Sequence, residues 1–194
     1  MVPSLSGPAV RGRRPGAETG GLLEAYAVRS AYSGRGTRGP GGGMAGTGGF
    51  GIRRAGTVAE LLAAAHLYDG PARPEWAERF LASPGHLMLI GYAADGFPAG
   101  FVTGIEMIHP DKGAELCLYE LGVDEAYRRR GLGRALTEAL LAAARERDCA
   151  GAWVPVDTDN GPALATYRSA GAADEGVCAI RAWSFDDEPW AVPS

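Results

Sequence analysis

The sequence has few cysteines and few histidines, and neither residue type shows a disulfide or metal-binding pattern. Its 194 residues include three cysteines, which are far apart, odd in number and without Cys-x-x-Cys spacing (Cys117, Cys149 and Cys178). This pattern indicates neither a disulfide framework nor a zinc site, and it favours reduced thiols in a cytoplasmic protein. The three histidines are scattered, and none pairs with a carboxylate at metal-ligand spacing, so no metal is expected (His66, His86 and His109).

Long apolar runs are also missing, as is basic charge in the patterned part of the chain. No stretch of about 18 apolar residues occurs, so no membrane-spanning helix is expected. Residues 1–50 carry six arginines and two glutamates, and the chain's formal net charge of −4 therefore leaves a net −8 on residues 51–194. An acidic folded region argues against a nucleic-acid partner and favours a cationic substrate.

Composition divides the chain into three parts. Residues 1–48 are rich in glycine and arginine, offer few side chains to bury and lose much entropy on ordering, so they are predicted to be disordered. Residues 49–185 carry regular hydrophobic patterning and are expected to form the folded domain. Residues 186–194 are acidic and proline-bearing, which predicts a flexible tail.

Hydrophobic periodicity predicts strands and helices from residue 50 onwards. Strands are expected at Phe50–Arg54, His86–Ala93, Phe97–Ile108, Glu115–Val123, Ala152–Val156 and Val177–Phe185. Helices are expected at Val58–Ala65, from Pro74 onwards, at Gly131–Arg147 and at Pro162–Ala170. The expected fold class is therefore α/β (α+β), with helices on the faces of a mixed sheet.

The strongest predicted helix starts at a pair of glycines. Small and apolar residues recur along it at spacings of three and four (Leu132, Ala135, Leu136, Ala139, Leu140 and Ala143). Its unpaired first amides and partial positive charge suit a diphosphate, and glycine lets the anion approach the backbone. The pattern alone also fits a glycine-capped helix start without a ligand. A P-loop is excluded because no Gly-Lys-Ser/Thr follows, and the missing third glycine disfavours a dinucleotide-binding fold.

The segment Arg128-Arg129-Arg130-Gly131-Leu132-Gly133 resembles motif A of the GCN5-related N-acetyltransferase (GNAT) family, Arg/Gln-x-x-Gly-x-Gly/Ala. The resemblance extends from about Ile52 to Phe185. It implies the GNAT fold, whose mixed and mostly antiparallel central sheet is splayed between the fourth and fifth strands, with helices on both faces. It also implies acetyl-CoA as co-substrate, held at Leu121, Val123, Arg128, Arg129, Arg130, Gly131, Leu132, Gly133, Arg134, Ala135 and Asn160.

A second segment, Asn160–Gly171, resembles the family's later motif, Asn-x-x-Ala-x-x-x-Tyr followed by a helix-ending glycine. Asn160 is also a good N-cap, and Pro162 suits a first helical turn, so both residues have a structural explanation as well. The resemblance implies that Asn160 contacts the pantetheine or orients the cofactor. It implies that Tyr167 hydrogen-bonds or protonates the departing thiolate. Taken in isolation, Tyr167 fits a buried core aromatic whose hydroxyl reaches solvent.

An amine substrate needs a proton acceptor, because an ammonium group is not a nucleophile. Glu120, near the end of the fourth predicted strand, is the candidate. Simple alternation puts Glu120 on one strand face with Leu118 and Gly122, whereas a bulge, common in this family's fourth strand, would break that parity. Tyr119 and Asp157 are further candidates for binding the substrate. A strand-end glutamate that faces solvent or pairs with an arginine is the alternative.

Within the family, the residues around Glu120 and the later motif are most similar to the aminoglycoside 3-N-acetyltransferase branch, with Glu where that branch carries Asp. The resemblance implies direct transfer of acetyl, in a ternary complex, to a primary amine of a small cationic substrate that is aminoglycoside-like or a polyamine. A protein N-terminal or lysine acetyltransferase and a non-catalytic acyl-CoA-binding module are the alternatives. Because the family often pairs as dimers, a homodimer is among the expected assemblies.

Overall fold

A computed structural model describes residues 49–183 and residue 185. Five strands form one sheet: β1 (Gly51–Arg54), β2 (His86–Tyr92), β3 (Pro98–His109), β4 (Gly113–Val123) and β5 (Ala152–Trp153). The α-helices are α2 (Val58–Ala63), α3 (Pro74–Ala82), α4 (Leu132–Glu146) and α5 (Gly161–Ser169). Two short 3₁₀ helices, η1 (Ala65–Leu67) and η2 (Glu125–Tyr127), complete the described elements.

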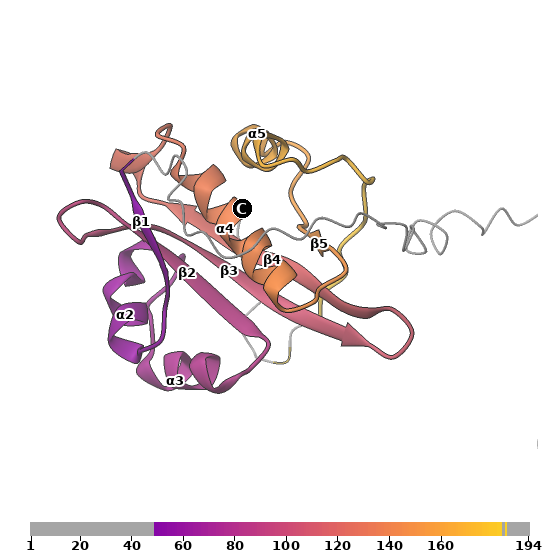
Figure 1. Cartoon of the computed structure of the whole chain (residues 1–194), viewed down its shortest axis with the longest axis horizontal. Helices are drawn as coiled ribbons and strands as arrows, with labels where there is room; N and C mark the ends of the chain where they lie inside the picture. Colours follow the sequence, from indigo (N-terminus) through magenta and orange to yellow (C-terminus); the bar gives the residue numbers. More distant parts are fainter. Residues whose placement is uncertain (1–48, 184, 186–194) are drawn as a thin grey trace, which may run out of the picture. The chain divides into compact units, whose positions relative to one another are not determined.

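The strands lie in sequence order across the sheet (Figure 1). The first four are antiparallel to their neighbours, whereas β5 runs parallel to β4. The helix α4 supplies the crossover that a parallel pair requires. The predicted mixed, mostly antiparallel sheet is thereby confirmed.

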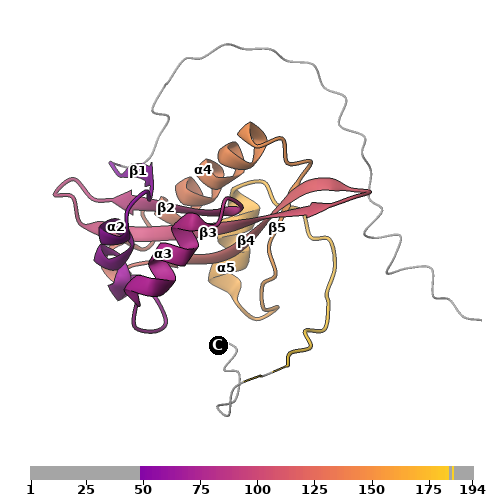
Figure 2. The ribbon, with the colours of Figure 1, turned by 90° about the horizontal axis from the view of Figure 1, so that it is seen from below.

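Helices cover both faces of the sheet, as predicted. Figures 1 and 2 show α4 and α5 on one face and α2 and α3 on the other. Each face has its own cluster of buried side chains: the larger one lies under α4 and includes Leu87 and Leu118, and the smaller one lies under α2 and α3 and includes Ile90 and Phe101.

The apolar stripe predicted for α4 packs on the sheet. Leu132, Leu136 and Leu140 are fully buried. Glycines on the strands below make room for them: a Cβ on Gly91 would lie 2.6 Å from Leu132 Cδ1, and one on Gly100 would lie 3.1 Å from Leu132 Cδ2. The helix axis can approach the sheet this closely because those positions carry no side chain.

Two predicted strands differ from the structure. The fifth was expected to reach Val156 but ends at Trp153, since Pro155 has no N–H to donate to a ladder. The strand predicted at Val177–Phe185 is wrong, because the described residues of that segment form no strand and are exposed.

The predicted disorder of residues 1–48 and the predicted flexibility of residues 186–194 lie outside the described residues. Within residues 49–183, no helix has the length and apolarity that crossing a membrane would require.

Candidate functional site: the start of α4 and the opening between β4 and β5

The first turn of α4 has the backbone of an anion-binding nest. Gly131, its N-cap residue, is left-handed with φ of 83°, and Arg129 is left-handed with φ of 61°. No described side chain caps this helix. The amides of the first turn have no partner within the helix, so a concave group of N–H donors lies where the helix dipole is positive. This geometry fits the diphosphate that the sequence predicts here.

The arginines around the nest are exposed but already make contacts. Arg128 donates its Nε–H to the carbonyl oxygen of Val123, at 3.1 Å. The guanidinium of Arg130 lies over the ring of Tyr127, and Arg134 pairs with Glu138 one turn along the helix. Arg128 therefore also fixes the end of β4.

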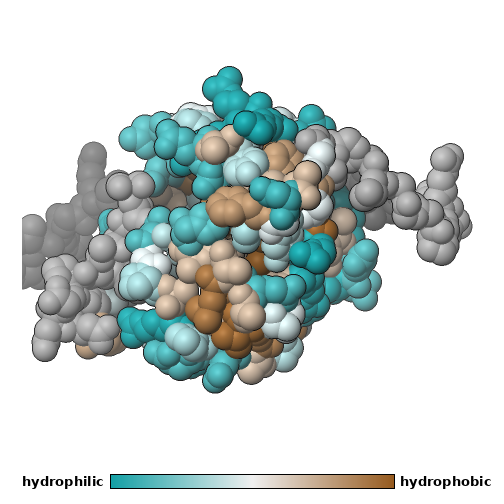
Figure 3. Space-filling view, turned by 90° about the vertical axis from the view of Figure 1, so that its left-hand side faces the viewer, coloured by the Kyte–Doolittle hydropathy of each residue, from teal (hydrophilic) through white to brown (hydrophobic). Residues whose placement is uncertain are grey.

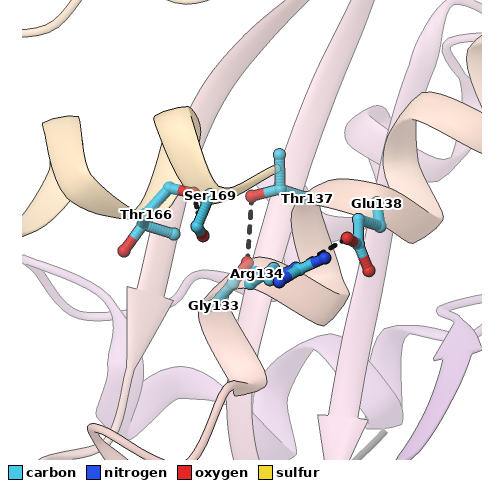
Figure 4. Close-up of polar contacts among 6 residues, drawn as sticks. All are labelled: Gly133, Arg134, Thr137, Glu138, Thr166 and Ser169. Carbon is cyan, nitrogen blue, oxygen red and sulfur yellow. Dashed lines mark hydrogen bonds and ion pairs between the residues drawn. The ribbon is translucent and has the colours of Figure 1, made fainter. Parts of the chain in front are cut away.

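Gly133 is the place where α4, α5 and β4 meet. A Cβ at this position would lie 3.3 Å from Thr166 Cγ2 of α5 and 3.7 Å from Val123 Cγ2 of β4. Figure 4 shows α5 beside the first turn of α4, where Thr137 donates a hydrogen bond to the carbonyl oxygen of Gly133 at 2.9 Å. The second glycine of the motif thus permits close packing, whereas the first permits the left-handed backbone. Leu132 is buried in the core, and Ala135 is half-buried.

The sheet opens beyond the middle of β4. The ladder between β4 and β5 consists of Leu116 opposite Ala152 and Cys117 opposite Trp153. Beyond Cys117, β4 continues to Val123 with described partners on its β3 side only. Because the Asp124 N–H donates to Ala99 of β3, the carbonyl of Val123 points toward the open side. The predicted splay is confirmed, and it exposes the backbone around Leu121 and Val123.

A β-bulge at Tyr119 decides where Glu120 points. The register pairs Gly104 with Leu118 and Thr103 with Glu120, so Tyr119 has no opposite residue. The prediction from simple alternation, which put Leu118 and Glu120 on one face, is wrong: Leu118 packs under α4, whereas Glu120 shares the α2–α3 face with Gly122. The inserted residue reverses the alternation. Tyr119 itself is 63% exposed.

Glu120 lies in a half-buried corner beside the segment that links η1 to α3. Desolvation raises the pKa of its carboxyl above the ordinary value, and the neighbouring charge of Asp69 raises it further. Burial, with a contribution from Glu120, raises the pKa of Tyr68 to about 12. The site thus holds a carboxyl group poised closer to neutrality than an exposed glutamate would be. Neither a Glu120 that faces solvent nor one that pairs with an arginine matches this environment.

Tyr167 lies on the opposite face, in the cluster under α4. Its side chain is buried, and desolvation raises its pKa, so the phenol keeps its proton at neutral pH. With Leu118 and Trp153 it lines a groove of about 660 Å³ beside β5 and α5. Glu120 and Tyr167 are therefore separated by the sheet, and one ligand can meet both only at the opening between β4 and β5.

The two remaining candidates lie nearer the surface. Asn160 caps α5, its Oδ1 accepting the Ala163 N–H at 3.1 Å. Asp157 is exposed in the loop between β5 and α5. The sequence assigned no role to Tyr68 and Asp69, which the fold brings close to Glu120. Their aromatic–acid pairing before a Gly-Pro turn is the signal that could have singled them out.

The glycine-opened start of α4 therefore lies beside the opening in the sheet. The chain belongs to the GNAT acetyltransferase family: the family profile "Acetyltransferase (GNAT) family" matches residues 56–172. The recognised family, the fold and the enzyme class are thus confirmed.

Two curated relatives are N-acetyltransferases according to their names. One is the N-alpha-acetyltransferase RimI of Mycobacterium tuberculosis, which is 39% identical over 113 residues (58% of this chain and 68% of that protein). The other is the [ribosomal protein bS18]-alanine N-acetyltransferase of Escherichia coli, which is 32% identical over 114 residues (58% of this chain and 74% of that protein). Both matches cover more than two thirds of the relative.

Two solved structures share the fold at low sequence identity. One is an aminoglycoside acetyltransferase from an uncultured soil metagenomic sample in complex with sisomicin (TM-score 0.65, 16% identity, 71% of this chain and 97% of that chain). The other is AAC(6')-Iy in complex with a bisubstrate analog (TM-score 0.61, 16% identity, 70% of this chain and 98% of that chain). At this identity they bear on the fold alone, and the similarity to the aminoglycoside 3-N-acetyltransferase branch stays a prediction.

Proposed function

We propose that the chain binds acetyl-CoA across the start of α4 and the open edge of β4, and transfers acetyl directly to a primary amine held at Glu120. The observation that carries this proposal is the coincidence of two features at one place. The left-handed pair Arg129 and Gly131 forms the anion nest, and the last part of β4 before it, from Leu118 to Val123, has no β5 partner. A diphosphate in the first feature directs the attached pantetheine into the second.

On the cofactor side, the amides from Arg129 to Arg134 hold the diphosphate, and the backbone of Leu121 and Val123 pairs with the pantetheine arm. The structure fits that arm, because the Val123 carbonyl points toward the open side. Arg128 donates to this carbonyl oxygen through its Nε–H. Among the described contacts, the two Nη atoms of Arg128 make no hydrogen bond, so they can donate to phosphate oxygens. Asn160 orients the arm from the α5 side.

On the amine side, Glu120 takes a proton from the bound ammonium and frees the nitrogen lone pair. The nitrogen then attacks the thioester carbonyl carbon, a C–N bond forms and the C–S bond breaks. Tyr167 gives its phenolic proton to the departing thiolate, and a second proton, lost by the nitrogen as the amide forms, restores the phenol. The raised pKa of Glu120 makes its carboxylate a stronger base than an exposed glutamate, and the raised pKa of Tyr167 keeps the proton on its phenol at neutral pH.

Two acceptor classes follow from different observations. The acidic patterned region and the branch resemblance favour a small cationic amine, aminoglycoside-like or a polyamine, with Tyr119 and Asp157 at its entrance. The N-terminal acetyltransferases among the sequence relatives favour the α-amine of a polypeptide. A homodimer and a cytoplasmic location stay predictions from the sequence.

The test has two stages. Calorimetric titration of the full chain with acetyl-CoA and with S-acetylpantetheine, which lacks the diphosphate, should give binding to acetyl-CoA only. Thiol release should then be followed with aminoglycosides, polyamines and peptides as acceptors. Equal binding of both thioesters would contradict the nest, and binding without turnover on any amine would favour the non-catalytic module.

A further inference from the structure

An apolar groove lies beside the corner that holds Glu120. It has a volume of about 420 Å³ and lies between α2, α3, β2 and the segment that links η1 to α3. Its lining is mainly aliphatic and aromatic (Leu61, Tyr68, Pro71, Trp76, Phe80 and Met88). Figure 3 views the molecule from the side of β1 and α2 and shows hydrophobic residues gathered low on that face, ringed by hydrophilic ones.

Tyr68 connects this groove to the site on β4. Its hydroxyl donates to the carbonyl oxygen of Leu61 at 2.8 Å, and its ring packs edge-on against Phe101 of β3, with 5.1 Å between the ring centroids. The same segment closes on β4, since a Cβ on Gly122 would lie 3.3 Å from the Leu67 carbonyl oxygen. Tyr68 thus forms a wall with the groove on one side and Glu120 on the other.

Both acidic and basic groups border this groove. Asp69 follows Tyr68 directly, is exposed, and acts electrostatically on Glu120. The guanidinium of Arg73, which also lines the groove, lies over the Trp76 ring, 5.6 Å from the ring centroid. An ammonium group is favoured beside the two carboxylates, and an apolar group is favoured beyond Tyr68. A molecule that carries an ammonium group and an apolar group close together would satisfy both parts of the site.

We propose that this groove receives an apolar side chain next to the reactive amine, so that the preferred acceptors are peptides or proteins with a large apolar residue at their free N-terminus. The inference rests on the proposed function and names its substrate class. A polyamine or an aminoglycoside satisfies the carboxylates but has no side chain to displace water from Trp76 and Phe80. Charge complementarity at Asp69 and Glu120 sets the orientation of the peptide, with its first side chain toward the groove.

The experiment uses peptides that differ only in their first residue, Gly, Ala, Leu or Phe, together with a polyamine and an aminoglycoside. From Gly to Leu or Phe, kcat/KM for thiol release should rise about 10- to 100-fold, the range expected for filling an apolar pocket. Trp76→Ala should flatten this gradient, whereas Trp76→Phe should restore much of it. Trp76 is 57% exposed, so its removal leaves the core intact.

The matched control is Trp183→Ala, which removes an exposed tryptophan far along the chain from the groove and should keep the full gradient. Equal rates for all the peptides, or a gradient that survives Trp76→Ala, would overturn the groove assignment alone. A faster reaction with the polyamine or the aminoglycoside would also overturn it. Turnover of no amine by the unmodified chain would instead overturn the proposed function, and the inference with it.

Discussion

The two faces of the sheet differ in the size of the side-chain cluster that each one buries. Under α4, glycines such as Gly91 and Gly100 let fully buried leucines reach the strand backbone. Under α2 and α3, the cluster is smaller, and the segment before α3 leaves a half-buried corner in which Glu120 and Tyr68 have shifted pKa values. The face under α4 fixes the backbone geometry at the start of that helix, whereas the face under α2 and α3 can accommodate charge.

That contrast divides the chemistry between the faces. The proposed base, Glu120, lies on the face covered by α2 and α3, and the proposed acid, Tyr167, lies on the face covered by α4. A strand paired on both sides would keep the two groups apart, so the opening between β4 and β5 is what the reaction needs. Four substitutions test this division, ordered by expected effect.

Replacing the base should have the largest effect. Glu120→Gln should lower kcat/KM about 10²- to 10⁴-fold, the usual contribution of a general base. The unmodified enzyme should lose activity as pH falls through the raised pKa of Glu120, and the variant should lack this acid limb. The pH–rate profile checks both expectations, and an acid limb that persists in the variant would assign it to another group.

The same variant should be more stable. Because the pKa of Glu120 is raised in the folded protein, its ionisation is easier in the unfolded chain, and it destabilises the fold above the ordinary carboxyl pKa. At neutral pH, Glu120→Gln should therefore raise the Tm measured by thermal unfolding. A Tm that is unchanged at neutral pH and differs from that of the unmodified protein only at acid pH would contradict a raised pKa of Glu120.

Replacing the acid should have the next largest effect. Tyr167→Phe should lower kcat about 10²-fold, because the thiolate leaves without a proton, while Kd for acetyl-CoA changes little. Single-turnover thiol release and calorimetry measure the two quantities separately. Since the ring is buried and phenylalanine keeps it, thermal unfolding should match the unmodified protein. Unaltered turnover would remove Tyr167 from the mechanism.

The nest can be tested with a matched pair of glycines. Gly131 and Gly113 both have left-handed backbones, and a Cβ would meet no atom within 4 Å at either position. Alanine should cost about 1–2 kcal/mol of local strain at each. Only Gly131→Ala should also weaken acetyl-CoA binding, by about tenfold, because Gly113 lies at the distant β3–β4 turn. Equal Kd values for the two variants would argue against the nest.

The smallest effect is expected at Asp69. Its negative charge raises the pKa of Glu120, so Asp69→Asn should move the acid limb of the rate profile to lower pH while leaving kcat at high pH close to that of the unmodified enzyme. The shift should shrink in high salt, since Asp69 is exposed. A limb that does not move would show that the two carboxylates act independently.

The local elements could be predicted from the sequence, because their signals lie within a few residues. Thr57 and Glu60 form a capping box at the start of α2, the leucines of α4 repeat at helical spacing, and Gly131 marks a left-handed helix start. Such features depend on propensity, capping and periodicity, which neighbouring residues alone supply. The motif at residues 128–133 was readable for the same reason.

Which side chains lie close together depends on contacts between segments that are distant in the sequence. The bulge at Tyr119 depends on the register with β3, and it moved Glu120 to the face opposite Leu118. The pairing of Glu120 with Asp69, which lies far from it in the sequence, depends on how the segment before α3 closes on β4. The strand predicted at Val177–Phe185 had the local propensity, but its described residues pair with no other described strand. Strand register and edge pairing are long-range properties, so no window of neighbouring residues encodes them.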